Sequence, residues 1–494
     1  MYSFQKRVKM NQLFFGDNLD VLRESIKDKS IDLIYLDPPF NSKANYNLLF
    51  KTPNGHESDA QITAFEDTWH WGEQAEREFN EILYQENTHV AEMIRAFRQF
   101  LGVNDVMAYL TMMTNRLIEL HRVLKPTGSL YLHCDPTASH YLKMLMDAVF
   151  GPENFLNEII WHYHRWSAQT NRFQRIHDVI FFYSKSKNSI FNMLYEDYTA
   201  GTLKRWKGMK RKTTVLEDGS LYQEEDTEGV KGANMGDVWD ISIINANAKE
   251  RLGYPTQKPI ALLERIINAS SNLGDVVLDP FCGCGTTIAA AQKYDREWIG
   301  IDITHLAISL IEKRLRDSFR DVKYEVHGTP KDIDGARDLA KRDKYQFQWW
   351  ACSLVNAQPY MGKKKGADSG IDGLIYFQDD KTVAKKIIVS VKGGEHINVA
   401  MIRDLGHVVD REKAEIGLFV TLTEPTKPMK EEASQAGFYK SPYKDSNFPK
   451  IQILTIENLM NRSEYPRYPD LAKGGLTFKK AKTEIKKGTT ESLF

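Results

Sequence analysis

The sequence predicts an α/β fold built on a largely parallel sheet, and three observations support this prediction. Short apolar runs at 31–36 and 276–279 indicate buried parallel strands, which need helical crossovers in order to pair. The segment 105–124 carries apolar residues at helical spacing, as a crossover helix would. Because 494 residues exceed one typical hydrophobic core, we expect two or three domains.

Composition and charge exclude several classes of protein. The formal net charge is +0, so a polyanion would have to bind a local patch of basic side chains. Apolar stretches are too short for a membrane span, and residues 1–7 lead into no signal-peptide core. Four cysteines make no disulfide framework in a chain of this size. We therefore expect a cytoplasmic protein without membrane contact.

Strand and helix patterns alternate in the first 150 residues. We expect a strand at 12–15, a short helix at 18–25 and a second strand at 31–36. The helix over 105–124 should stop at the Pro and Gly that follow it, and a strand should follow at 129–133. The polar stretch 54–100 shows no clear pattern.

The alternation of strand and helix patterns becomes less regular beyond residue 157 and then resumes. Aromatic, His and Arg residues dominate the loosely patterned part, whereas Leu262 and Ile266 mark an amphipathic helix where the α/β pattern resumes. A helix at 286–292 and a strand at 297–302 follow. The predicted divisions are a first half at 1–157, an insertion at 158–250, a second half at 251–330, a linker at 331–344, a further domain at 345–460 and a polar, basic tail at 461–494.

A glycine-rich turn at 281–285 lies between a strand-like run and a helix start. Gly283 and Gly285 let the backbone approach a ligand, and the helix N-terminus supplies free N–H donors. Asp302 ends the next strand roughly 20 residues on, where an acidic group accepts hydrogen bonds from ribose hydroxyls. The turn lacks the third glycine of the dinucleotide pattern, so we expect a nucleotide-like cofactor without a pyrophosphate.

The tetrapeptide Asp37-Pro38-Pro39-Phe40 directly follows the first of the apolar strands. An exocyclic amine on a nucleobase is a poor nucleophile because its lone pair is delocalised into the ring. Asp37 and the Pro38 carbonyl could accept its two N–H groups and favour a more tetrahedral, reactive nitrogen. Phe40 could stack on a base taken out of the duplex. Because this motif and the glycine turn both follow parallel strands, they should face one crevice.

At these two motifs the chain resembles the DNA amino-methyltransferases that use S-adenosylmethionine. The order of catalytic motif, basic segment and cofactor turn is similar to that of the permuted beta group of this family, over about 11–315. The resemblance implies a Rossmann-like methyltransferase sheet with an inserted target-recognition region. It assigns catalysis to Asp37, Pro38, Pro39 and Phe40, and cofactor binding to Asp17, Thr256, Lys258, Asp279, Phe281, Gly283, Gly285 and Asp302.

The resemblance also implies a place for each part of the cofactor. It puts Asp302 at the ribose, Asp17 near the adenine ring, and the segment 256–259 at the carboxylate. The glycine turn lies at the methionine end. Asp-Pro-Pro-Phe is usual in adenine-N6 enzymes, so adenine in duplex DNA is the expected target and cytosine N4 is the alternative.

The insertion at 158–250 occupies the position where this family recognises its target. Basic side chains there could contact phosphates, which position a duplex without reading its sequence. The alternative is a solvated, charged loop. The candidates for phosphate contacts are Lys204, Arg205, Lys207, Lys210, Arg211 and Lys212, and the candidates for base contacts are Trp161, His162, His164, Arg165 and Trp166.

The C-terminal part resembles the Mrr-type restriction endonucleases of the PD-(D/E)xK group, an α/β fold. Asp372 precedes a strand-like run that ends at Lys392, and this resemblance implies a Mg²⁺ site at Asp372 with Lys392 beside the attacked phosphate. Ser390 stands where that group usually has Glu or Gln, and Gln348 where a helical Glu is common. Asp368 or Glu395 could compensate, or the domain could be an inactive or DNA-binding relic.

Three functional hypotheses follow. The first is an adenine-N6 methyltransferase acting on double-stranded DNA, fused to a nuclease-like domain in one restriction-modification polypeptide, with a homodimer as a further option. The second is a metal-dependent nuclease whose methyltransferase half senses cofactor or site. The third is a DNA-binding regulator with neither activity.

Overall fold

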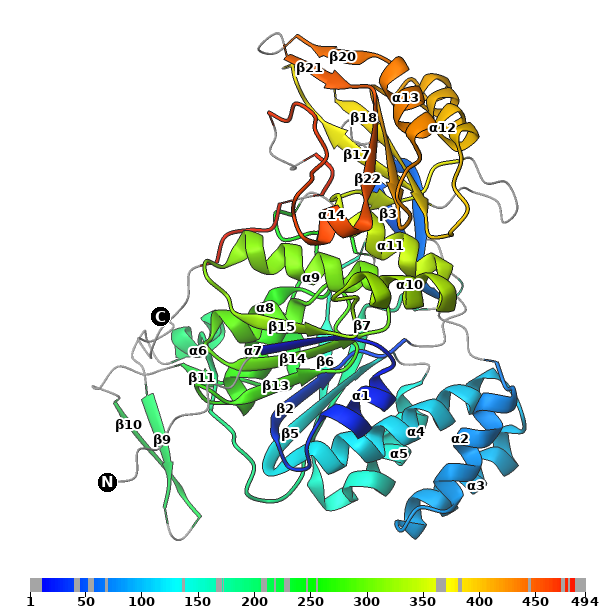
Figure 1. Ribbon diagram of the computed structural model, residues 1–494. Coiled ribbons are helices and arrows are strands. Elements are labelled where there is room, and N and C mark those ends of the chain that lie inside the picture. Colours follow the sequence, from blue (N-terminus) through cyan, green and yellow to red (C-terminus); the bar gives the residue numbers. More distant parts are fainter. Residues whose placement is uncertain are drawn as a thin grey trace, which may run out of the picture.

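The structure is a computed structural model, shown in Figure 1. Its described residues are organised by a nine-stranded sheet in the first two-thirds of the chain and a five-stranded sheet in the C-terminal part. The residues that the structure describes are 11–39, 45–51, 57–66, 70–135, 138–165, 171, 173–205, 211–216, 219–225, 232–245, 248–254, 256–360, 370–380, 384–442, 446–471, 476–478 and 480–484.

The nine-stranded sheet has the strand order β12-β6-β7-β5-β2-β13-β14-β1-β15. All neighbouring pairs are parallel except β6 with β7 and β7 with β5. Strand β2 precedes the Asp37 motif and pairs with β13, which precedes the glycine turn, although they lie far apart in sequence. The strands are β1 Asn11–Phe15, β2 Ile31–Leu36, β5 Leu124–Cys134, β6 Phe155–His162, β7 His177–Ser184, β12 Val238–Asp240, β13 Val276–Asp279, β14 Glu297–Asp302 and β15 Tyr324–His327.

Helices cover both faces of this sheet, because residues of the central strands alternate between two apolar cores. Ile34 and Leu36 face the core built with α1, α2, α3, α4 and α5, and Leu33 and Tyr35 face the core built with α7, α8 and α9. Figure 1 shows these two helix layers on opposite sides of the strands. The helices are α1 Asn18–Ser25, α2 Glu73–Leu83, α3 Thr88–Leu101, α4 Asp105–Val123, α5 Ser139–Phe150, α7 Ile260–Ser270, α8 Thr286–Lys293 and α9 His305–Ser318.

The remaining elements of the first two-thirds are small. The stretch 54–100, which shows no clear pattern in the sequence, contains β4, α2 and α3. A 3-10 turn, Pro152–Asn154, links α5 to β6. The other elements form hairpins or short pieces: β3 Asn45–Lys51 with β4 Glu57–Glu66, β8 Tyr195–Glu196 with β11 Ala233–Asn234, β9 Arg211–Val215 with β10 Leu221–Glu225, and the helix α6 Ala200–Arg205.

The C-terminal part folds around a five-stranded sheet with the order β16-β17-β18-β19-β22. Its strands bury Phe377, Ile387 and Val389 against helices. The elements are α10 Ile333–Arg342, α11 Lys344–Leu354, β16 Gln358–Pro359, β17 Gly373–Phe377, β18 Lys385–Lys392, α12 Val399–Arg411, β19 Ile416–Thr421, α13 Lys427–Gln435, β20 Phe438–Ser441, β21 Ser446–Pro449, β22 Ile451–Thr455 and α14 Ile456–Met460.

The α/β prediction is confirmed, but the predicted linker at 331–344 is wrong. Asp332 caps helix α10 by accepting a hydrogen bond from the Gly335 N–H (2.8 Å), and α10 buries Ala336 and Leu339 in the C-terminal core. The many charged residues of this stretch lie on the solvent side of an amphipathic helix, and a short amphipathic helix of this kind resembles a linker in composition.

The tail is also attached to the body of the protein. Thr477 is buried and both donates to the Tyr376 carbonyl and accepts from the Tyr376 N–H, each at 2.9 Å. Glu484 forms an ion pair with Lys293 of α8 at 3.1 Å. Within the described residues, none of the helices has the length and apolar character that a membrane crossing requires.

The two parts of the chain share an apolar core behind the glycine turn. Leu306 and Leu310 of α9 cluster with Trp349 of α11 and with Tyr254 and Cys284. Helix α11 therefore packs against the helix that begins just after Asp302 (Figure 1).

Candidate active site

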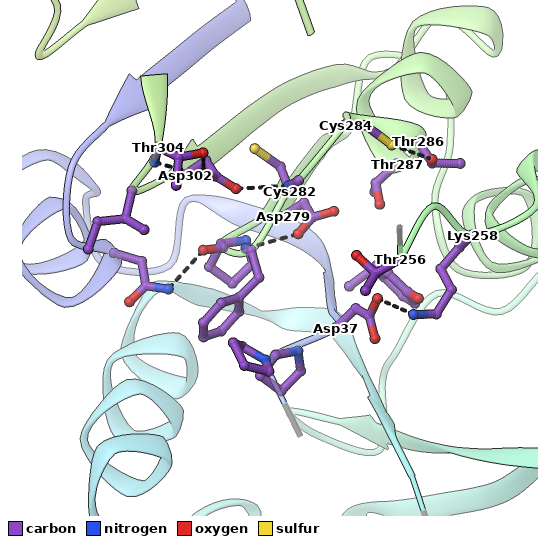
Figure 2. Close-up of a pocket in the computed structure, with 18 of the residues that line it drawn as sticks. Asp37, Thr256, Lys258, Asp279, Cys282, Cys284, Thr286, Thr287, Asp302 and Thr304 are labelled. Atoms are coloured by element: carbon purple, nitrogen blue, oxygen red, sulfur yellow. Dashed lines mark hydrogen bonds and ion pairs between the residues drawn. The ribbon is translucent and has the colours of Figure 1, made fainter. Parts of the chain in front are cut away.

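A pocket of about 310 Å³ opens where β1, β2, β13 and β14 end. Parallel strands of an α/β sheet place loops at this carboxyl edge, so motifs far apart in sequence meet there. Figure 2 shows Asp37, Asp279 and Asp302 in this pocket, with the Asp37 carboxylate turned toward Lys258. Among the predicted site residues, those that line it are Asp17, Asp37, Pro38, Pro39, Thr256, Lys258, Asp279, Phe281, Gly283 and Asp302.

The glycine turn is held in place by its own backbone and by the next strand. The Cys282 N–H donates to the Ile301 carbonyl (3.1 Å), and the Gly285 N–H donates to the Cys282 carbonyl (2.7 Å). Gly283 and Gly285 have φ of 49° and 72°, the left-handed region that favours glycine. A Cβ on Gly285 would lie 2.8 Å from Ile311, so this position caps helix α8 only as glycine.

Asp302 ties this turn to the strand beside it. Its Oδ2 accepts from the Gly283 N–H at 3.0 Å, and its Oδ1 accepts from the N–H and the hydroxyl of Thr304, both at 2.9 Å. Burial nevertheless raises the pKa of Asp302 to about 6. Burial also raises the pKa of Asp279 to about 7, although its carboxylate accepts from the Phe281 N–H at 3.1 Å. Neither carboxylate forms an ion pair within the described residues.

Asp17 also lines the pocket and is fixed by hydrogen bonds. It caps helix α1 through the Leu19 N–H (2.8 Å) and accepts two hydrogen bonds from the buried Arg116, at 2.9 and 3.0 Å. Arg116 also donates to Asn18 (2.5 Å), whose amide donates to the Pro280 carbonyl at 2.8 Å. The sequence analysis did not single out Arg116, which lies within helix α4, far from both pocket motifs in sequence.

The two oxygens of the Asp37 carboxylate differ in their surroundings. Oδ2 accepts a hydrogen bond from Lys258 Nζ and forms an ion pair with it (Figure 2). Oδ1 is buried and has no hydrogen-bond partner among the described residues. A buried acceptor without a donor is costly, so Oδ1 is suited to a ligand N–H. Phe40, the fourth residue of the motif, lies outside the described residues.

Three polar side chains that the sequence analysis missed lie behind Asp37. Tyr35 Oη is 2.9 Å from His133 Nδ1, and His133 Nε2 is 3.3 Å from Asp178 Oδ2. Burial, then the nearby Asp37 carboxylate, raises the pKa of Tyr35 well above its usual value. Burial opposes the charge on Asp178, yet its hydrogen bond with His133 holds the pKa of the carboxyl below its ordinary value.

The predicted target-recognition residues divide into four groups. Lys204 and Arg205 are exposed on α6, as phosphate contacts would require. Trp161 is buried and donates to the Ile241 carbonyl (2.8 Å), so the prediction that it touches bases is wrong. His162 lies 3.3 Å from Asp240, and its ring packs edge-on against His164. Lys207, Lys210 and Trp166 lie outside the described residues, as do the side chains of Arg211 and Lys212.

The nuclease-like site is organised around a structural aspartate. Asp372 Oδ1 accepts from Gln348 Nε2 at 2.8 Å, and Oδ2 accepts from the Val391 N–H at 2.6 Å. Ser390 is buried, whereas Glu395 is exposed and Lys392 is half-buried. Of the described residues, no group of three carboxylate, His or Cys ligands gathers at Asp372. Asp368 lies outside the residues that the structure describes.

Comparison with known proteins gives two family matches. A family model named N6_N4_Mtase and described as DNA methylase matches residues 31–313, more than half of the chain. A second model, described as NACHT-associated inactive Restriction Endonuclease 1, matches residues 354–461. The first match contains both pocket motifs, and the second contains Asp372 and Lys392.

Curated relatives cover the same region. The type II methyltransferase M.HpaI of Haemophilus parainfluenzae is 32% identical over 257 residues, which are 51% of this chain and 74% of the relative. The type II methyltransferase M.EcaI of Enterobacter cloacae is 27% identical over 361 residues, 62% of this chain and 69% of the relative. The DNA adenine methyltransferase YhdJ of Escherichia coli (strain K12) is 27% identical over 309 residues, 61% of this chain and 82% of the relative.

Proposed function

Because the chain belongs to the N6_N4_Mtase family of DNA methylases, we propose that it transfers a methyl group from S-adenosylmethionine to adenine N6 in duplex DNA. The observation that carries this proposal is the buried Oδ1 of Asp37, which has no hydrogen-bond partner among the described residues and shares one pocket with Asp279 and Asp302. We further propose the permuted order of the beta group, since the catalytic motif precedes the cofactor turn.

The pocket residues fit S-adenosylmethionine. Asp279 is buried and Asp302 is half-buried, and neither forms an ion pair among the described residues. They would accept from the ammonium and the ribose hydroxyls of this cofactor. Asp17 would face the adenine ring, and Thr256 would lie at the methionine end with Phe281 and Gly283. When bound, the cofactor supplies a methyl group on a sulfonium, from which a neutral thioether leaves.

Residues of the chain orient the amine that is methylated. Lys258 fixes one oxygen of Asp37, so the carboxylate cannot rotate freely and Oδ1 keeps its direction. Oδ1 and the Pro38 carbonyl would accept the two amine hydrogens and draw the nitrogen lone pair out of conjugation with the ring. This positioning reduces the entropy lost on reaching the transition state. No covalent intermediate with the enzyme is needed.

Two points favour adenine over cytosine. The motif Asp37-Pro38-Pro39-Phe40 resembles the adenine-N6 type, and one of the relatives is named a DNA adenine methyltransferase. A part in a restriction-modification system is supported by the relatives named type II methyltransferases.

We propose that the C-terminal domain does not cleave DNA. Asp372 uses both carboxylate oxygens within the protein, Ser390 replaces an expected ligand, and the matching family is described as inactive. A Mg²⁺ ion prefers several oxygen ligands with near-octahedral geometry, and these residues supply few. The domain would then serve to support the methyltransferase half against which it packs.

The experiment that tests the proposed function identifies the methylated base. The full chain is incubated with unmethylated bacterial genomic DNA and methyl-labelled S-adenosylmethionine, and the DNA is digested to nucleosides for mass spectrometry. The proposal predicts label in N6-methyl-2′-deoxyadenosine. Label in N4-methyl-2′-deoxycytidine would overturn the adenine assignment, and DNA without label would overturn methyl transfer itself.

A further inference from the structure

A second feature of the pocket concerns the fate of a proton. When the amine nitrogen bonds to the methyl carbon, the carbon–sulfur bond breaks and its electron pair stays on sulfur. The nitrogen must then lose one N–H proton to regain neutrality. Asp37 is the nearest group that can accept it, and its open oxygen is Oδ1. The pocket would be closed by the cofactor and the DNA at this moment, so the proton needs a route out.

The Lys258 side of Asp37 offers no such route. Lys258 Nζ is an ammonium that carries three protons and no lone pair, and it already donates to Oδ2. On the cofactor side, the carboxylates that line the pocket, Asp279 and Asp302, are those proposed to hold the cofactor, so they are engaged when it is bound. The proton must therefore leave from the Oδ1 side.

His133 lies on that side. The distance from its Nδ1 to Asp37 Oδ1 is 3.9 Å, and its side chain is 0% exposed. This distance is longer than a hydrogen bond, but catalytic hydrogen bonds in unliganded proteins are often long and shorten when the substrate binds. Trp161 packs edge-on against the imidazole ring, with 5.5 Å between ring centroids, and restricts its motion.

Neighbouring strands hold this imidazole in one orientation. Tyr35 of β2 hydrogen-bonds Nδ1, and Asp178 of β7 hydrogen-bonds Nε2, as a carboxylate does when it orients a catalytic histidine. With the Tyr35 hydroxyl donating to Nδ1, the neutral ring carries its proton on Nε2 and donates it to Asp178. Asp178 also accepts from the Tyr163 hydroxyl at 3.1 Å.

We infer that His133 and Asp178 form a proton exit for methyl transfer, leading from Asp37 to the surface. This inference rests on the proposed function. The proton passes from Asp37 Oδ1 to His133 Nδ1, and the Tyr35 hydroxyl turns from donor to acceptor. His133 then releases its Nε2 proton to Asp178, whose side chain is 17% exposed and can pass it to solvent. His133 acts through Asp37 and does not touch the base, so it is a positioning residue that also accepts the proton.

The inference predicts a specific pH dependence. Only a neutral imidazole can accept a proton, so the rate of methyl transfer should rise with pH. Charged groups also act on the side chains around His133. Asp37, which follows β2, and Asp279 act on Tyr35 of β2. Asp135, which follows β5, and Glu158 of β6 act on Cys134. Arg165 and Arg175 act on Tyr163, which follows β6, and Lys258 acts on Asp178 of β7.

The test measures single-turnover methyl transfer against pH, with the full chain in excess over unmethylated bacterial genomic DNA. His133→Gln, which cannot accept the proton, should lower the plateau rate by at least about 10-fold and flatten the pH profile. Asp178→Asn should give a smaller loss and a shifted profile. His140→Gln, an exposed histidine on α5, should leave rate and profile unchanged. Equilibrium binding of S-adenosylhomocysteine and the melting temperature should be unchanged in all three.

Two results would overturn the inference while leaving the proposed function intact. One is a His133→Gln enzyme with the rate and pH profile of the wild type. The other is a variant that loses transfer equally at every pH together with cofactor binding or melting temperature, because that pattern indicates a purely structural histidine. If the wild type itself transfers no label to DNA, the proposed function fails and the proton exit fails with it.

Discussion

At the scale of single residues, the pocket is defined by carboxyl groups in surroundings that oppose their negative charge. Asp279 is buried and Asp302 is half-buried at the cofactor turn, and loss of solvation raises their pKa to about 7 and about 6. Such groups tend to lie at functional sites, because a ligand can compensate for the cost of burying a charge. Here the cofactor ammonium and ribose hydroxyls would be that compensation.

This burial makes stability and binding depend on pH in opposite directions. The folded-state pKa of Asp279 exceeds the ordinary carboxyl value, so its stabilising contribution is fully present below about pH 4 and is lost as pH rises through about 7. Asp279→Asn should therefore become more stable relative to the wild type as pH rises from about 5 to 8, by on the order of 1–4 kcal/mol. Denaturant unfolding without cofactor measures this difference.

The affinity for S-adenosylhomocysteine, measured against pH, is a second test of the charge on Asp279. The wild type should bind S-adenosylhomocysteine more tightly as pH rises, because only the ionised carboxylate attracts its ammonium, and Asp279→Asn should lose this dependence. Asp20→Asn removes an exposed carboxylate of α1 and controls for the change in net charge. A pH-independent difference between wild type and Asp279→Asn would contradict the account.

At the scale of elements, the backbone of the glycine turn admits little change. Gly285 has φ of 72° and lies against Ile311, whereas Gly406 lies in the interior of α12, where a Cβ would have nothing within 4 Å. The two glycines thus provide a matched pair for the same substitution.

Gly285→Ala should lower the free energy of unfolding by about 1–3 kcal/mol, because alanine is strained at positive φ and its Cβ meets Ile311. It should also weaken cofactor binding. Gly406→Ala should raise stability by about 0.5–1 kcal/mol, since alanine is the better helix former. Denaturant unfolding of both variants checks the pair, and equal effects of the two substitutions would refute the role given to the turn.

Elements also show what the sequence could and could not predict. Helix Asn18–Ser25 and strands Ile31–Leu36 and Glu297–Asp302 have the predicted bounds, because their periodicity and flanking turns are local signals. The linker prediction is wrong at helix α10, since a short charged helix has too few apolar residues to show helical spacing in the sequence. The polar side chains around Asp37 could not be predicted to meet there. His133, Asp178 and Lys258 come from distant segments, and only the strand order brings them together.

At the scale of the whole molecule, the C-terminal domain is joined to the cofactor site by packing and by hydrogen bonds. Gln346 of α11 accepts from the His305 N–H at the start of α9 (3.1 Å), three residues beyond Asp302. Leu310 of α9 is buried against Trp349 of α11 and against the residues behind the glycine turn, Tyr254 and Cys284. The domain thus supports the helix that follows Asp302, the aspartate proposed to bind the ribose.

Leu310→Ala should destabilise the methyltransferase and C-terminal domains together, by about 2–5 kcal/mol, because it leaves a cavity in their shared core. Leu156→Ala on β6 is the control, since Leu156 is 42% exposed and its loss should change stability by about 0.5 kcal/mol or less. Calorimetry measures both. If Leu310→Ala left the transition unchanged, the interface would not contribute to stability.

Asp372 tests whether the C-terminal domain is a nuclease. Asp372→Asn should lower stability by about 1–3 kcal/mol, because it disturbs the acceptors for Gln348 and the Val391 N–H. Supercoiled plasmid should stay intact with Mg²⁺ and either protein. Cleavage by the wild type that requires Mg²⁺ and disappears in Asp372→Asn would show an active nuclease and contradict the structural role.

The most direct test of the central claim compares wild type with Asp37→Asn in methyl transfer to unmethylated DNA and in equilibrium binding of S-adenosylhomocysteine. Because Asp37 lies in the pocket but is not assigned to hold the cofactor, the variant should lose transfer by at least about 100-fold and keep its cofactor affinity. Transfer at the wild-type rate by Asp37→Asn would contradict the assignment of this carboxylate to catalysis.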